Sequence, residues 1–193
     1  MSGGGLGRRE LVAALLARRA GALVVPGLGS PTWDCFAAGD SPEYLYSWGG
    51  MGLCVPTALG LALARPERRV VAITGDGEML MGAGSLAVVA AEAPANLAIL
   101  VLDNESFGET GRQPGLTGRG VDIEAMARGA GIAETMTVHD MGALDALAEL
   151  LFHRPGPCFA VAKIALTQDP LVLPEKDGTV IARRFRAAVL RSD

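Results

Sequence analysis

Two hydrophobic patterns alternate along most of the chain. Short runs of consecutive apolar residues are typical of buried strands, whereas apolar residues that recur every three or four positions are typical of helices. The runs predict strands at residues 22–25, 44–48, 69–74, 96–102, 134–138 and 158–164. The recurring pattern predicts helices at residues 8–20, 53–64, 79–92, 122–129, 141–152 and 180–190, and a short helix that ends near residue 38.

The alternation of strands with helices predicts an α/β fold. Right-handed crossovers place the strands in a doubly wound, mostly parallel sheet with helices on both faces. Residues 1–7 are rich in glycine and are expected to be a flexible leader, and residues 8–193 are expected to form one domain that ends in a helix. The stretch from Asp103 to Gly120 is a long polar loop, and loops of that length are usually functional or disordered.

Three turns directly follow predicted strands. They are Gly49-Gly50, Gly75-Asp76-Gly77 and Asp103-Asn104. In a parallel sheet the carboxyl ends of the strands lie at one edge, and ligands of such folds bind there. We therefore expect the three turns to lie close together.

Asp76 raises a question of charge, because a buried carboxylate is costly unless it is paired or bound to a metal. The helix predicted to start near Met79 offers free N–H groups to an anion. Mg²⁺ would bridge such an anion to Asp76, and Asn104 would supply a neutral oxygen. Local chemistry thus suggests a diphosphate–Mg²⁺ site. Taken singly, however, Gly-Asp-Gly is most often an ordinary turn, and Asp103-Asn104 is a common way to open a loop.

Composition narrows the class of protein further. The net charge is −4 and the arginines are scattered, so there is no electrostatic footprint for nucleic acid. No apolar run reaches the ~20 residues that span a membrane, and the N-terminus lacks the apolar core of a signal peptide. Cys35, Cys54 and Cys158 show no paired spacing, which fits buried thiols in a reduced, cytoplasmic protein.

The spacing of the last two turns adds a resemblance to a family. Residues 78–102 place 25 residues between Gly-Asp-Gly and Asp103-Asn104. This resembles the motif of thiamine diphosphate-dependent enzymes, where Asn-Asn follows Gly-Asp-Gly at a similar distance. The stretch "SWGGMGLCVPTALGLALA" resembles the segment that holds the aminopyrimidine ring in these enzymes. The stretches "DNESFGETGRQP" and "RRFRAAVL" are similar to segments of sulfopyruvate and phosphonopyruvate decarboxylases, and the resemblance covers roughly residues 22–191.

The resemblance implies which residues would hold thiamine diphosphate and Mg²⁺. Asp76, the side chain of Asn104 and the backbone carbonyl of Ser106 would bind the metal. Met51 would bend the cofactor into its V shape, although residue type alone favours a plain core methionine. The implied cofactor contacts are Gly49, Gly50, Met51, Gly75, Asp76, Gly77, Glu78, Asn104, Ser106, Phe107 and Gly108.

The chain also departs from the pattern of these decarboxylases. Asp103 stands in place of the usual first Asn, Phe107 in place of a frequent Tyr, and Gly115 in place of a usual Thr. Arg112 is not typical of them either. Arg112 and Arg119 could bind an anionic end of the substrate, although a solvated loop arginine is at least as consistent with the sequence. These departures leave cofactor binding intact and the identity of the substrate open.

By this resemblance, the chain is expected to be the diphosphate-binding subunit of a heteromeric 2-oxo acid decarboxylase that releases CO₂ and an aldehyde. The activating glutamate of the family lies in a pyrimidine-binding domain, so no catalytic glutamate is assigned here and a partner subunit is expected to supply it. The apolar stretch "GGMGLCVPTALG" is expected to be partly a partner surface and to promote self-association. The alternatives are a carboligase subunit and a non-catalytic cofactor-binding module.

Overall fold

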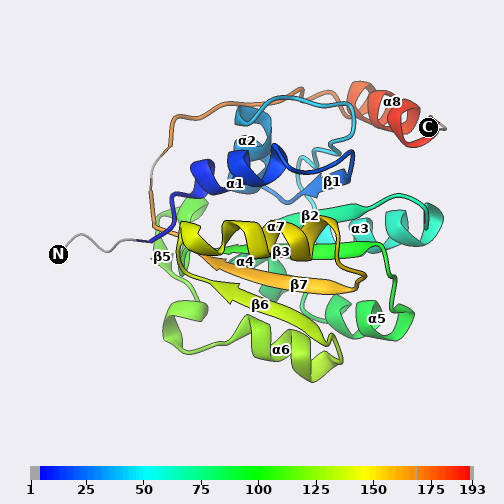
Figure 1. Cartoon of the computed structure of the whole chain (residues 1–193). Coiled ribbons are helices and arrows are strands. Elements are labelled where there is room, and N and C mark those ends of the chain that lie inside the picture. The colour runs from blue at the N-terminus through cyan, green and yellow to red at the C-terminus, as the bar shows by residue number, and fades with distance from the viewer. Residues whose placement is uncertain (1–4, 168, 192–193) are drawn as a thin grey trace.

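A computed structural model describes residues 5–167 and 169–191. Five parallel strands form one sheet in the order β1-β2-β3-β7-β6 (Figure 1). Their bounds, in the same order, are Leu23–Pro26, Val70–Gly75, Leu97–Asp103, Cys158–Lys163 and Glu134–Val138. Every residue of β3 is buried, as expected for a central strand that is covered on both faces.

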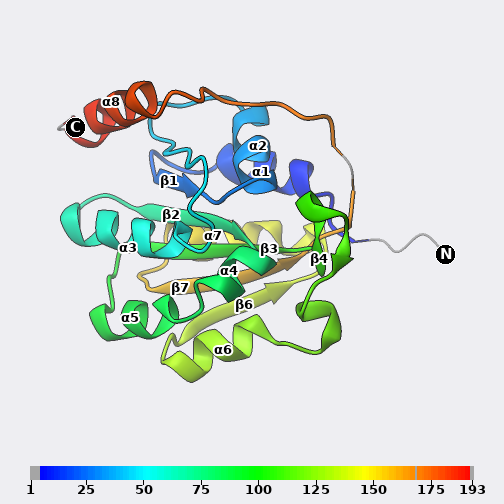
Figure 2. The same ribbon diagram turned by 180° about the vertical axis from the view of Figure 1, so that it is seen from behind.

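Helices cover both faces of the sheet, which confirms the predicted doubly wound architecture (Figures 1 and 2). One apolar cluster packs α1 (Arg8–Leu16), α2 (Ser30–Ala37) and α7 (Leu144–Phe152) against one face. The other face carries α3 (Cys54–Ala64), α5 (Ser85–Glu92) and α6 (Ile123–Ala130). Consecutive residues of β2 alternate between the two clusters, because successive side chains of a strand point to opposite faces.

The predicted strand at residues 44–48 is wrong. Tyr44 forms a single isolated bridge to Val24, and the rest of the segment between α2 and α3 is loop. Tyr44 and Tyr46 are buried because their rings pack edge to face, and the Tyr46 hydroxyl donates a hydrogen bond to Asp40. The apolar run therefore reflects aromatic packing beneath a loop, and this segment adds no sixth strand to the described sheet.

The predicted helix at residues 79–92 is two helices. The first, α4 (Asp76–Met81), begins three residues earlier than expected, and α5 follows after a break at residues 82–84. A side chain at Gly82 would overlap the backbone carbonyl of Gly52. Position 82 therefore requires a glycine, because the loop before α3 and the segment after α4 touch there. The break lets the loop that carries Met51 approach α4.

The long polar loop after β3 is ordered. It contains a small antiparallel pair, β4 (Ser106–Phe107) with β5 (Gln113–Pro114). Short 3₁₀ turns are found at Gly108–Thr110 and Thr117–Arg119, and a third precedes α7 at Met141–Ala143. The loop thus folds back over the carboxyl edge of the sheet.

Both ends of the described chain pack against the domain. The first four residues of the predicted leader lie outside the described residues, but Leu6 is buried and bridges to Ile164. The final helix, α8 (Gly178–Val189), confirms the predicted C-terminal helix and buries Ile181 and Phe185. Figures 1 and 2 show it on the β1 side of the sheet.

Two findings concern the cysteines and the helices of the described residues. Cys35, Cys54 and Cys158 are free and buried, as the sequence predicts. Among the helices at residues 5–167 and 169–191, none is long and apolar enough to cross a membrane.

The contact at Gly82 predicts a local cost. Gly82→Ala should lower the free energy of unfolding by roughly 1–3 kcal/mol, because the new methyl group overlaps the Gly52 carbonyl. Gly84→Ala is the matched control, since no atom lies within 4 Å of its added methyl group. Urea denaturation of both variants measures the difference, and equal stabilities would contradict the close approach.

Candidate functional site

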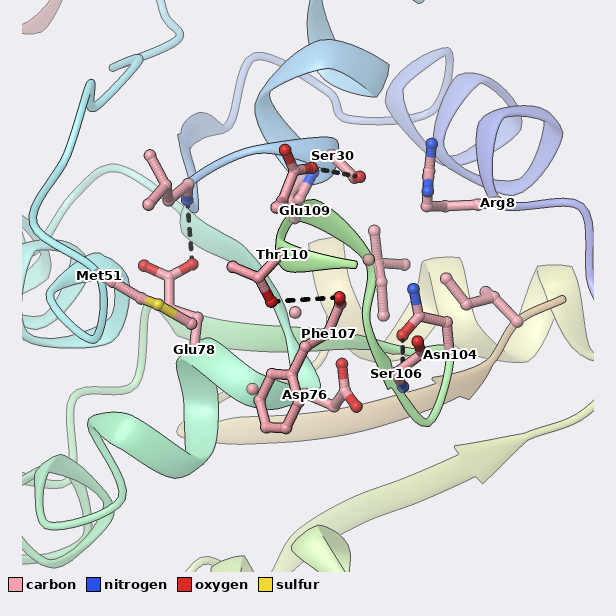
Figure 3. A pocket seen from close by; sticks show the side chains of 17 residues that line it. Arg8, Ser30, Met51, Asp76, Glu78, Asn104, Ser106, Phe107, Glu109 and Thr110 are labelled. Atoms are coloured by element: carbon pink, nitrogen blue, oxygen red, sulfur yellow. Dashed lines mark hydrogen bonds between the residues drawn. The ribbon is translucent and has the colours of Figure 1, made fainter. Parts of the chain in front are cut away.

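A cavity of about 210 Å³ opens at the carboxyl ends of β2 and β3 (Figure 3). It collects nine of the residues that the sequence predicts, from the loop before α3, from α4 and from the loop after β3. They are Met51, Gly75, Asp76, Gly77, Glu78, Asn104, Ser106, Phe107 and Gly108. Three predicted residues do not line it. Gly49 and Gly50 are exposed just before Met51, and Arg112 is exposed on the far part of the loop.

Asp76 is the first residue of α4 and is only 5% exposed. Burial, and then the nearby negative charge of Asp103, raise the pKa of Asp76 from 3.8 to about 6. The Thr117 hydroxyl lies 3.2 Å from Asp76 Oδ2, and no described basic side chain pairs with this carboxylate. Asp76 is therefore a buried acid whose charged form lacks a counter-ion.

Asn104 and Ser106 face the same cavity from a tight turn. The Ser106 amide donates a hydrogen bond to Asn104 Oδ1 at 2.9 Å, and Glu105 between them has a φ of +58°. This turn fixes the Asn104 side chain at the wall of the cavity near Asp76 (Figure 3). Asn104 and Ser106 are neither acids nor imidazoles, so they offer only neutral oxygens.

The donor chemistry of these residues fits Mg²⁺. Within the described residues, no group of three or more His, Cys, Asp or Glu side chains could hold a metal ion. A cation at this cavity would therefore combine one carboxylate with amide and main-chain oxygens, and a phosphorylated ligand would complete the set. Mg²⁺ takes all-oxygen coordination and is commonly bound by one or two carboxylates together with phosphates.

Glu78 also lines the cavity, and its side chain is held by two hydrogen-bond donors of the protein. Its Oε2 accepts hydrogen bonds from the Leu28 amide at 3.0 Å and the Thr74 hydroxyl at 2.9 Å. Burial raises the pKa of Glu78, and these donors act against that rise. A side chain at Gly27 would overlap the Glu78 carboxylate, so a larger residue there would displace this carboxylate from its present position. Glu78 thus ties α4 to the loop that begins α2.

Met51 and Phe107 form an apolar part of the wall. A side chain at Gly77 would lie 2.9 Å from the Phe107 ring and 3.7 Å from the Met51 methyl group. Gly77 therefore lets both side chains close over the start of α4. The Met51 side chain lines the cavity in Figure 3, and its role in bending the cofactor stays a prediction.

Sequence patterns do not single out several residues that line the cavity or contact its lining residues. Arg8 lines it from the start of α1 and is paired with buried Asp34. Ser30 also lines it, and its hydroxyl donates a hydrogen bond to Glu109 Oε1 at 3.3 Å. Thr117 reaches Asp76 only because the loop folds back, so its residue type and spacing carried no signal.

The fold and the site together define a class of protein: an α/β domain with a cavity at the carboxyl ends of its parallel strands, where ligands of such folds bind. Residues 32–162 match the family described as "Thiamine pyrophosphate enzyme, C-terminal TPP binding domain". The chain belongs to this family, which confirms the resemblance seen in the sequence.

Relatives agree with this placement. The chain is 35% identical over 163 residues to sulfopyruvate decarboxylase subunit beta of Methanothermobacter thermautotrophicus, with 84% of each chain covered. It is 38% identical over 172 residues to phosphonopyruvate decarboxylase of Streptomyces viridochromogenes, covering 87% of this chain but 42% of that protein. An X-ray structure from Mycobacterium smegmatis, described as a thiamin diphosphate-dependent enzyme, matches with a TM-score of 0.72 and 26% identity. That match covers 86% of this chain and 32% of the other.

The pKa of Asp76 predicts how the stability of the cation-free chain depends on pH. Because folding raises this pKa from 3.8 to about 6, the contribution of the carboxyl is fully present below 3.8 and is lost as the pH rises through 6. In EDTA, the free energy of unfolding should fall by roughly 1–3 kcal/mol over this range, relative to that of Asp76→Asn. Denaturant titrations of both proteins at several pH values test this, and parallel pH profiles would refute it.

Proposed function

We propose that the chain is the diphosphate-binding subunit of a heteromeric, thiamine diphosphate-dependent 2-oxo acid decarboxylase that releases CO₂ and an aldehyde. The observation that carries this proposal is the cavity at the ends of β2 and β3, which unites Asp76, Asn104, Ser106 and Met51. Family membership supports the cofactor, and two relatives named above act on sulfopyruvate and phosphonopyruvate by name. The proposed substrate is therefore a 2-oxo acid with a second acidic group.

Different residues of the chain would bind the metal, the diphosphate and the rings of the cofactor. Asp76, Asn104 and the Ser106 carbonyl would hold Mg²⁺, while Gly75, Gly77 and the amide of Glu78 would face the diphosphate. The remaining proposed contacts, toward the ring portions of the cofactor, are Gly49, Gly50, Met51, Phe107 and Gly108. When bound, thiamine diphosphate supplies a nucleophilic carbon and an electron sink for the loss of CO₂.

The two glutamates that line the described cavity already have hydrogen-bond partners. Glu78 is occupied by the Leu28 amide and the Thr74 hydroxyl, and Glu109 lies against Ser30. We therefore propose that a pyrimidine-binding partner subunit supplies the activating glutamate. The name of the first relative, a subunit beta, supports a partner of this kind.

An exposed apolar patch beside the cavity supports the same proposal. Met51, Leu53 and Met81 are 40%, 58% and 68% exposed. The loop that carries Met51 and Leu53 approaches Met81, because a side chain at Gly52 would lie 3.2 Å from Met81. Exposed apolar patches commonly mark interfaces. Since Cys54 and Val55 of the same stretch are buried, only its start is proposed as a surface for the partner or for self-association.

The metal assignment predicts a loss of cofactor binding. Asp76→Ala should abolish Mg²⁺-dependent binding of thiamine diphosphate, and Asn104→Ala should weaken it strongly, because each removes an oxygen ligand. Calorimetric titration of the assembled complex, with and without Mg²⁺, measures the affinity. Asp145→Ala, at a carboxylate that is 91% exposed on α7, is the control. Unchanged affinity in Asp76→Ala would overturn the assignment.

Arg112 is the proposed contact for the anionic end of the substrate. Its amide donates a hydrogen bond to the Phe107 carbonyl at 3.0 Å, which ties it to the cavity wall, and its side chain is exposed. Arg112→Ala should raise KM for 2-oxo acids with a second acidic group by about tenfold for each ~1.4 kcal/mol lost. Arg183→Ala, at an exposed arginine on α8, is the control. Equal effects on neutral and acidic 2-oxo acids would exclude this role.

The two-subunit proposal predicts that the chain alone is inactive. Decarboxylation should appear only on mixing with the pyrimidine-binding subunit and should saturate near one partner per chain. Steady-state assays against added partner, with masses from light scattering, test this, and product analysis separates the alternatives. An acyloin product would indicate a carboligase, and no product in the assembled complex would indicate a non-catalytic module. Full turnover by this chain alone would contradict the proposal.

A further inference from the structure

Lys163 lies at the carboxyl end of β7, next to the turn that carries Asn104. The parallel register pairs Asp103 of β3 with Lys163, so the two side chains meet at neighbouring strand ends. Lys163 Nζ is 2.8 Å from Asp103 Oδ2 and 2.5 Å from Glu105 Oε1. One ammonium group therefore contacts the residues on both sides of Asn104.

Asp103 also contacts residues nearer to the cavity. Its Oδ1 accepts hydrogen bonds from the Glu105 amide at 3.0 Å and from the Thr117 hydroxyl at 2.7 Å. The same hydroxyl is 3.2 Å from Asp76 Oδ2. A continuous set of contacts thus runs from Lys163 through Asp103 and Thr117 to Asp76, and a branch of it holds the backbone that follows Asn104.

The two carboxylates that pair with Lys163 differ in how much they depend on its charge. The Asp103 side chain is 3% exposed, and Lys163 is its only ion-pair partner in the part of the chain that the structure describes. Removing one partner of a buried pair leaves an uncompensated charge, which is strongly destabilising. The Glu105 side chain is 47% exposed, so water replaces its partner at little cost. Asp103 is therefore the carboxylate that needs Lys163.

We propose that Lys163 is a positioning residue for the metal site. By neutralising buried Asp103, it holds the Asn104 turn in place and, through Thr117, the Asp76 side chain, so that both can bind Mg²⁺. This inference rests on the proposed Mg²⁺–thiamine diphosphate site and adds a residue from a strand that does not line the main cavity.

The proposed role of Lys163 depends on the negative charge of Asp103. A variant that is neutral at position 103 separates the effect of this charge from that of the side-chain shape. Asp103→Asn keeps the size of the side chain and a carbonyl oxygen that accepts the bonds from Glu105 and Thr117. An amide needs no counter-ion, so Lys163 should become dispensable once residue 103 is neutral. The effect of removing Lys163 should therefore depend on the residue at position 103, which is the coupling that a double-mutant cycle measures.

The experiment is a Mg²⁺ titration of thiamine diphosphate binding by the full chain, assembled with its partner subunit. Calorimetry gives the Mg²⁺ concentration at half-saturation. Lys163→Met should raise this concentration about tenfold or more, equivalent to ~1.4 kcal/mol. Asp103→Asn/Lys163→Met should stay within about threefold of Asp103→Asn. Glu105→Gln, which removes only the exposed partner, should stay within about threefold of the unmodified chain.

Several results would overturn the inference. A purely structural Lys163 would lower the unfolding temperature of Lys163→Met and leave half-saturation unchanged. An equal loss on removing Lys163 from the unmodified chain and from the Asp103→Asn variant would exclude charge pairing. If Lys163→Met does not fold, a foldable Asp103→Asn/Lys163→Met with the Mg²⁺ response of Asp103→Asn supports the proposal, and a further loss contradicts it. Absence of Mg²⁺-dependent binding in the unmodified chain would contradict the proposed function, and this inference with it.

Discussion

The burial of three carboxylates at one edge of the sheet is the constraint on which the site depends. Asp76, Glu78 and Asp103 are each 5% exposed or less. A backbone amide and a hydroxyl satisfy Glu78, and an ammonium group neutralises Asp103. Asp76 is left with hydrogen-bond donors and without a described cation. A buried acid in this condition supports our proposal that a ligand brings a positive charge to the cavity.

The parallel sheet provides the means to collect these groups from distant parts of the chain. Strands β2 and β3 end side by side, so the start of α4 and the turn at Asn104 share one cavity. Glycines then allow close approach. Gly77 leaves room for Phe107 and Met51, and the break at Gly82 admits the loop through Gly52. The fold therefore brings apolar and polar side chains together around one small cavity.

Much of this arrangement could be predicted from the sequence. Apolar runs located all five strands of the main sheet, and the two turns after β2 and β3 identified Asp76 and Asn104. Where prediction failed, tertiary contacts decided. The run around Tyr44 is apolar because of aromatic packing and not strand pairing, and the helix after Asp76 is interrupted because two backbone segments touch at Gly82.

The residues that sequence patterns missed share one property. Thr117, Lys163 and Leu28 act on Asp76, Asp103 and Glu78 from segments far away in the chain. Their types are ordinary for a loop, a strand end and a turn, so no local pattern distinguishes them. The register of β3 with β7 explains the contact of Lys163, the folding back of the loop after β3 explains that of Thr117, and the loop after β1 brings Leu28 to Glu78.

The location of the metal is the most direct test of the central claim. Crystals of the assembled complex grown with thiamine diphosphate and Mn²⁺ in place of Mg²⁺ would locate the ion by its anomalous scattering. We expect one peak at the cavity between β2 and β3, within coordination distance of Asp76, Asn104 and the Ser106 carbonyl and bridged to the diphosphate. A metal and diphosphate bound with Asp76 outside coordination distance would contradict the claim.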